Sequence, residues 1–96
     1  MFARLIQMRA SAEADFDQIM AAVRERVVPS VRQLPDFRAD YFAGDSAGGR
    51  LVSFVIFETE EGLAAAEALF QKMRPQVEAL GLHFDSVENL PLLVGG

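Results

Sequence analysis

The stretch LVSFVIFETEEGL, from Leu51 to Leu63, decides the fold of this 96-residue chain. Among its first eight residues only Ser53 and Glu58 are polar. A strand with one solvated face alternates polar and apolar residues, and this run does not alternate. We therefore expect both faces of the strand to be covered. A chain of this length can cover one face with its own helices, so we expect a second subunit to cover the other.

The composition predicts one domain that spans residues 1–96. A hydrophobic content of 51% with eight phenylalanines is enough for a core in a chain of this size. The net charge is −5, and because phosphate contacts need clustered Lys and Arg, we expect no nucleic-acid partner. The chain has no cysteine, which excludes disulfides, thiolate catalysis and cysteine-ligated metal or iron–sulfur centres.

The first ten residues, MFARLIQMRA, form too short an apolar run for a signal peptide or a membrane span, because Arg4 and Arg9 interrupt it. We therefore expect no membrane partner. A small fold without disulfides fits a reducing compartment, and we expect a cytoplasmic location.

Four strands are predicted from apolar-rich runs bounded by turn residues. They are placed at 2–9, at 37–43, at 50–58 and within 84–94. In the second strand we expect Phe37 and Tyr41 on one face and Phe42 on the other. The sequence GDSAGG at 44–49 tolerates positive φ and predicts a hairpin loop between the second and third strands. Pro91 predicts either an edge position for the last strand or a bend in it.

Two amphipathic helices are predicted from apolar residues spaced three and four apart. Ser11 is the expected N-cap of the first helix, and Pro29, which has no N–H to donate, predicts a kink or a break just before it. Thr59 is the expected N-cap of the second helix. Pro75 is expected to interrupt that helix, and Gly81 to end it.

The order strand, helix, strand, strand, helix, strand is that of a ferredoxin-like α+β sandwich. Such a fold has a four-stranded antiparallel sheet with two helices on one face. A soluble monomer would make the other face polar, whereas this sequence keeps it apolar. We therefore expect a homodimer.

Two segments give the chain a resemblance to a known family. VVPSVRQLPDF at 27–37 and VSFVIFETEEGLAAAEA at 52–68 are similar to sequences of the dimeric α/β-barrel superfamily, within its antibiotic-biosynthesis-monooxygenase-like group. Asp36 stands where that group commonly has Gly, and Phe57 where it commonly has Trp. The resemblance implies a homodimer whose two sheets pair to form a barrel, with the helices outside.

The resemblance also implies two activities, which are cofactor-independent oxygenation of quinol-type aromatic compounds and oxidative degradation of haem. The Asn, Trp and His of the haem degraders fall near Gln7, Ala66 and Gln76, so all three are changed. The only histidine, His83, follows the helix-ending Gly81. We therefore expect no haem degradation of that type. A lone histidine also excludes a multi-histidine metal site.

Eight residues are candidates for a functional site. The catalytic candidates have ionisable side chains in or beside the predicted strands, and they are Tyr41, His83 and Arg38. The ligand-binding candidates are polar or aromatic residues within strands, and they are Gln7, Ser53, Phe54, Phe57 and Asn89. Each has a structural alternative. It is a cross-strand pair for Arg38 and Tyr41, a surface position for His83 and a core position for the two phenylalanines. For Ser53 the alternative is a hydrogen bond to the backbone, and for Gln7 and Asn89 it is a network at the dimer interface.

The leading functional hypothesis is a cofactor-independent monooxygenase that acts on an aromatic or quinol-type small molecule, with no metal or other cofactor. The alternative is a non-enzymatic ligand-binding or stress-associated barrel dimer. A ferredoxin-like regulatory module of a larger assembly is a third hypothesis. The sequence does not identify the substrate.

Overall fold

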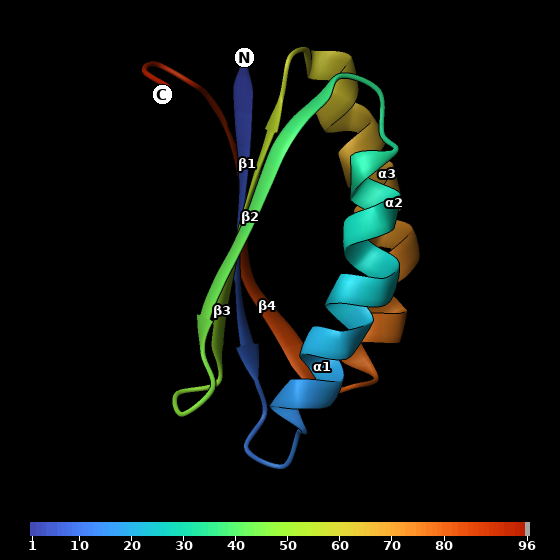
Figure 1. Cartoon of the computed structure of the whole chain (residues 1–96), viewed down its shortest axis with the longest axis vertical. Coiled ribbons are helices and arrows are strands. Elements are labelled where there is room, and N and C mark those ends of the chain that lie inside the picture. Colours follow the sequence, from blue (N-terminus) through green and yellow to red (C-terminus); the bar gives the residue numbers. More distant parts are fainter. Residues whose placement is uncertain (96) are drawn as a thin grey trace.

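The computed structural model describes residues 1–95 and contains one antiparallel sheet with all its helices on one face (Figure 1). The strands are β1 (Phe2–Ala10), β2 (Phe37–Asp45), β3 (Arg50–Phe57) and β4 (Leu82–Pro91). The helical elements are α1 (Phe16–Ala22), the π-helical segment η1 (Val23–Val27), α2 (Val28–Arg32) and α3 (Glu60–Glu78). The strand order β2-β3-β1-β4 and the alternation of elements confirm the predicted ferredoxin-like fold. No helix within residues 1–95 is long and apolar enough to cross a membrane.

The first helix begins later than predicted. Asp15, and not Ser11, is the N-cap, because its side chain accepts hydrogen bonds from the N–H groups of Asp17 and Gln18. The break expected before Pro29 takes the form of the π-helical segment η1, in which the N–H of Val28 bonds to the carbonyl of Val23. The wider turn shifts the hydrogen-bond pairing by one residue, and the helix then continues as α2.

The second helix is continuous, so the predicted interruption at Pro75 is wrong. Pro75 and Gln71, whose carbonyl loses its helical N–H partner, are both exposed, and water can satisfy that carbonyl. The cap is as predicted, since the Thr59 hydroxyl accepts from the N–H of Gly62 at 3.2 Å. Gly81 has a φ of 99° and stands between the end of α3 and the start of β4.

All four strand bounds differ from those predicted, β1 and β3 by only one residue each, since they end at Ala10 and Phe57. β2 extends to Asp45, so the hairpin turn is confined to residues 46–49. β4 begins at Leu82 and ends at Pro91. Its place at the edge of the sheet confirms the position that Pro91 predicted.

Strand β3 lies inside the sheet, between β1 and β2, and its two faces have different surroundings. Leu51, Ser53, Val55 and Phe57 are buried beneath the helices. The residues between them are only partly buried, and they lie on the face that has no helix. The chain therefore covers one face of this strand, as expected, and leaves the other uncovered.

The uncovered side of the sheet, called here the open face, is largely apolar. Three rows of cross-strand neighbours cross it. The rows are Tyr41–Phe54–Leu5–Glu88, Ala43–Val52–Gln7–Ser86 and Ala39–Ile56–Ala3–Leu90. Tyr41 is 62% exposed and Leu90 is also exposed, both large side chains for such a position.

Candidate functional site

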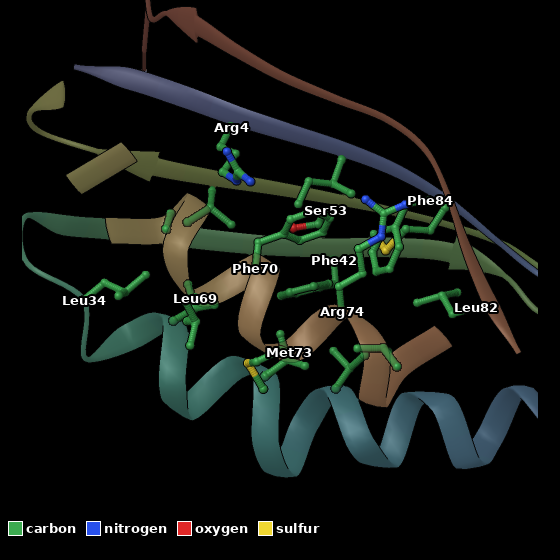
Figure 2. A pocket seen from close by; sticks show the side chains of 18 of the residues that line it. Arg4, Leu34, Phe42, Ser53, Leu69, Phe70, Met73, Arg74, Leu82 and Phe84 are labelled. Atoms are coloured by element: carbon green, nitrogen blue, oxygen red, sulfur yellow. The ribbon is translucent and has the colours of Figure 1, made fainter. Parts of the chain in front are cut away.

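A cavity of about 90 Å³ lies between the sheet and the helices. Its walls include members of both buried core clusters, so it separates the two halves of the core. Figure 2 shows Arg4 and Ser53 on the sheet side and Phe70, Met73 and Arg74 on α3 opposite them. The lining is otherwise aliphatic and aromatic.

Arg4 places a buried positive charge at this cavity. Its side chain is 3% exposed. Its Nη2 donates to Oε2 of Glu67 on α3 at 2.9 Å, and its Nη1 donates to Oδ1 of Asn89 on β4 at 3.2 Å. The guanidinium also lies 5.4 Å from the ring centroid of Phe70, a cation–π distance. A guanidinium has five N–H donors, and the other three have no acceptor within residues 1–95.

A second guanidinium lies against two rings of the cavity wall. Phe70 and Phe84 pack edge to face with centroids 4.9 Å apart. The guanidinium of Arg74 lies 5.7 Å from the first ring and 5.4 Å from the second. Its Nε pairs with Oε2 of Glu78 at 3.3 Å, one helical turn further along α3. Arg74 is therefore a second guanidinium at the cavity wall, and its charge is balanced in part by Glu78.

Ser53 supplies the hydroxyl of the site. It is 4% exposed and lines the cavity. Its side chain makes no hydrogen bond to the described part of the chain, and since no buried side-chain oxygen there lacks a partner, its Oγ is accessible from the cavity. Ser53 pairs with Ile6 and Val55 pairs with Arg4, so Ser53 and Arg4 are diagonal neighbours on the same face.

The carboxylate beside the cavity is a poor base. Partial burial raises the pKa of Glu67, but the hydrogen bond and the charge of Arg4, helped by Gln71 and Arg74, lower it more, so the net pKa lies below its ordinary value. Glu67 is 46% exposed and does not line the cavity. None of the lining residues is His, Asp or Glu. The cavity therefore offers positive charge and a hydroxyl, without a carboxylate or imidazole to accept a proton.

Three of the eight sequence-predicted site residues lie on the cavity side of the sheet. Ser53 and Phe57 line the cavity, and Asn89 reaches it through its hydrogen bond to Arg4. Gln7, Tyr41 and Phe54 lie on the open face instead. Their predicted roles in a site remain predictions, and the structure does not place them at this cavity.

The face expected for Tyr41 was wrong because of a β-bulge. The pairing of β2 with β3 shifts register between Phe37 and Ala39. The extra residue reverses the alternation of side chains beyond it. Phe37 and Phe42 therefore share the helix side, and Tyr41 points to the open face.

Arg38 and His83 also lie away from the cavity. Arg38 is exposed and its Nη1 pairs with Oε1 of Glu58 at 2.8 Å. His83 is exposed on β4, opposite Arg9 of β1. The structure thus does not bring the three catalytic candidates, Tyr41, His83 and Arg38, together, and their catalytic roles stay predictions.

Sequence reasoning missed Arg4, Glu67 and Arg74. Arg4 was considered only as an interruption of an apolar run. A signal was present, because Arg4 alternates with Phe2, Ile6 and Met8 along the strand. Its side chain therefore shares one face of the strand with three apolar side chains. No pattern in the sequence showed that this set faces a cavity.

Comparison with solved structures shows several full-length similarities. An antibiotic biosynthesis monooxygenase superposes with a TM-score of 0.75 at 22% identity, covering 98% of this chain and 100% of the other. A dimeric ferredoxin-like protein from an uncultured marine organism superposes with a TM-score of 0.74 at 8% identity, covering 100% of this chain and 98% of the other. The monooxygenase ActVA-Orf6 of Streptomyces coelicolor, in complex with nanaomycin D, superposes with a TM-score of 0.70 at 14% identity, covering 99% of this chain and 88% of the other.

No protein-family model matches the sequence, and no curated protein matches it. The identities to these solved structures are low, and it is the backbone over almost the entire chain that agrees. The agreement includes the monooxygenase-like proteins to which the segments at 27–37 and 52–68 pointed. The chain has the fold shared by the antibiotic biosynthesis monooxygenases and the dimeric ferredoxin-like proteins.

Proposed function

We propose that this protein is a cofactor-independent monooxygenase that acts on a small quinol-type aromatic compound and works as a homodimer. One observation carries the proposal: a buried guanidinium and an available hydroxyl face an otherwise apolar cavity with aromatic walls. Apolar walls with a few convergent polar groups are typical of small-molecule sites. The similar structures named as monooxygenases support the activity, and those named as dimeric support the assembly.

The size of the cavity limits the substrate. A dry protein cavity of about 150 Å³ accepts benzene, whereas this one has about 90 Å³. A single ring therefore enters when flexible walls such as Met73 move aside, or when part of the ligand extends through the opening. A flavin or a haem is far larger than this space. Within residues 1–95, no three side chains of the His, Cys, Asp or Glu type gather as a metal-binding set.

The cavity suits a substrate that reacts as an anion. Because no carboxylate or imidazole lines it, the quinol loses its proton to water, and Arg4 stabilises the resulting negative oxygen. The carbanion form of the substrate then adds O₂ at a ring carbon to give a hydroperoxide. Loss of water leaves a carbonyl there. The CH₂ group of the keto tautomer becomes C=O, one oxygen atom of O₂ is retained, and the other leaves as water.

Oxygen uptake with single-ring hydroquinones tests the proposal. We expect uptake above the protein-free autoxidation rate, with one ¹⁸O atom from ¹⁸O₂ in the product. Arg4→Met should lower this rate by about 10- to 100-fold, since a charge-assisted hydrogen bond is worth about 1.5–3 kcal/mol. Arg24→Met is the matched control, because Arg24 is an exposed arginine that does not line the cavity. Uptake equal to autoxidation for every compound would refute the proposal.

The lack of a carboxylate or imidazole in the cavity wall favours one second candidate, a ligand-binding dimer without catalysis. Binding of the same hydroquinones under nitrogen, followed by chemical-shift changes of the cavity methyl groups, separates the two. Binding without oxygen uptake would establish the second candidate.

A further inference from the structure

We propose that the cavity selects aromatic ligands that bear a carboxylate, and that Arg4 binds this group. The inference rests on the cavity being the site of the proposed function, and it names a substrate class, the hydroxylated benzoates. The structure provides three observations for it, which are the unused donors of Arg4, the position of Ser53 and the placement of Glu67.

Arg4 has more hydrogen-bonding capacity than the protein uses. Its guanidinium is almost entirely buried, yet only two of its five donors have acceptors, one on Glu67 and one on Asn89. A buried charge is costly unless it is fully paired. A planar guanidinium matches a carboxylate by two parallel hydrogen bonds, and a phenolate oxygen offers no such match. The unused donors of Arg4 therefore favour a carboxylate, and in such a substrate Arg4 stabilises the ring oxyanion through its charge and not through a hydrogen bond.

Ser53 offers a second polar contact in the same cavity. It is the diagonal neighbour of Arg4 across β1 and β3, and both residues line the cavity. The Ser53 hydroxyl stands on the β3 side, whereas the Arg4 guanidinium bonds to Asn89 on β4. A ligand held at Arg4 by its carboxylate can thus present a ring hydroxyl toward Ser53. Phe70 lies beside the guanidinium and provides an aromatic wall for that ring.

Glu67 limits the affinity for such a ligand. Its carboxylate occupies Nη2 of Arg4 from outside the cavity and adds a negative charge near the bound acid. Solvent screens this charge in part, because the side chain is 46% exposed. Replacing it by the neutral Glu67→Gln should therefore strengthen the binding of a carboxylate. It should leave the binding of a neutral ligand unchanged.

The test compares 2,5-dihydroxybenzoate with its neutral isostere 2,5-dihydroxybenzamide, in binding measurements under nitrogen on the full chain. We expect wild type to bind the acid at least about tenfold more tightly. Arg4→Met should weaken binding of the acid by about 10- to 100-fold, a range set by charge-assisted hydrogen bonds, and leave binding of the amide unchanged. Glu67→Gln should strengthen binding of the acid alone. Arg24→Met should change the affinity for neither compound. Thermal melting of each variant checks that it is folded.

Equal affinities for the acid and the amide, or an acid affinity unchanged by Arg4→Met, would overturn this inference. Failure of wild type to bind either compound would overturn it as well. Charge-dependent binding, with oxygen uptake equal to autoxidation for every compound tested, would leave the inference standing and refute the oxygenase. Oxygen uptake above autoxidation, with equal affinities for the acid and the amide, would do the reverse.

Discussion

Replacing Phe54 by aspartate places a carboxylate in the middle of the open face, between Leu5 on β1 and Tyr41 on β2. Phe54 is already partly buried in the protomer, so packing of two copies of this face removes from water only the remaining third or less of its side chain, about 0.5–1 kcal/mol of the roughly 1.5–3 kcal/mol for full burial. A two-fold axis doubles each change, so the lost burial in Phe54→Asp should cost about 1–2 kcal/mol, and the desolvation of the two carboxylates adds to this cost. The dimer dissociation constant should rise by at least about tenfold.

Sedimentation velocity over a concentration series measures this change directly. Wild type should sediment as a dimer at micromolar concentration, and Phe54→Asp as a folded monomer with an unchanged circular dichroism spectrum. Ala64→Asp is the control, because it adds the same charge at an exposed position of α3 on the helix side. A wild-type monomer at every concentration, or equal dissociation constants for wild type and Phe54→Asp, would refute the reasoning.

Two further predictions concern stability. A Cβ at Gly62 would lie 3.0 Å from Cβ of Phe57, so Gly62→Ala should lower the free energy of unfolding by about 1–3 kcal/mol in urea titrations; the turn variant Gly48→Ala should be near neutral. The pKa of Glu67 lies below its ordinary value of 4.5, since Arg4 outweighs the effect of partial burial. The ionised Glu67 therefore adds to the free energy of unfolding above its unfolded-state pKa, and this stabilisation is lost on acidification. Wild type should thus lose more stability than Glu67→Gln as the pH falls below 4.5. Because Glu67 is half exposed, the difference should stay below about 1 kcal/mol, and equal urea midpoints at every pH would contradict it.

The fold was predictable because each element has a local signal. The apolar spacing of the helices, the run at 51–57 and the Thr59 cap each appear in a short window of sequence. The errors occurred where the environment of a residue overrode the local sequence rule. Asp15 competed with Ser11 for the cap, and the exposed surface at Pro75 let the helix continue.

The site was harder to predict because it depends on which side of the sheet each residue faces. Ser53 and Phe54 are adjacent in sequence, yet one lines the cavity and the other lies on the open face. In a strand that is apolar on both faces, the sequence does not indicate which set faces the helices. The β-bulges, near Phe37 and between Gln7 and Met8, change this assignment again.

The burial of Arg4 is better explained by a ligand than by the fold. Neighbours of Arg4 on the cavity side include Val55 and Ile6, among which an aliphatic side chain of similar volume would pack well. Replacing a buried ion pair by such residues is often neutral or stabilising. Glu67 and Asn89 are accessible to water and would stay solvated without Arg4. Both terminal nitrogens of Arg4 have an acceptor within residues 1–95, and no buried side-chain nitrogen or oxygen there lacks a partner. Three of the five N–H groups of Arg4 still have no acceptor, and an anion in the cavity would supply acceptors for them.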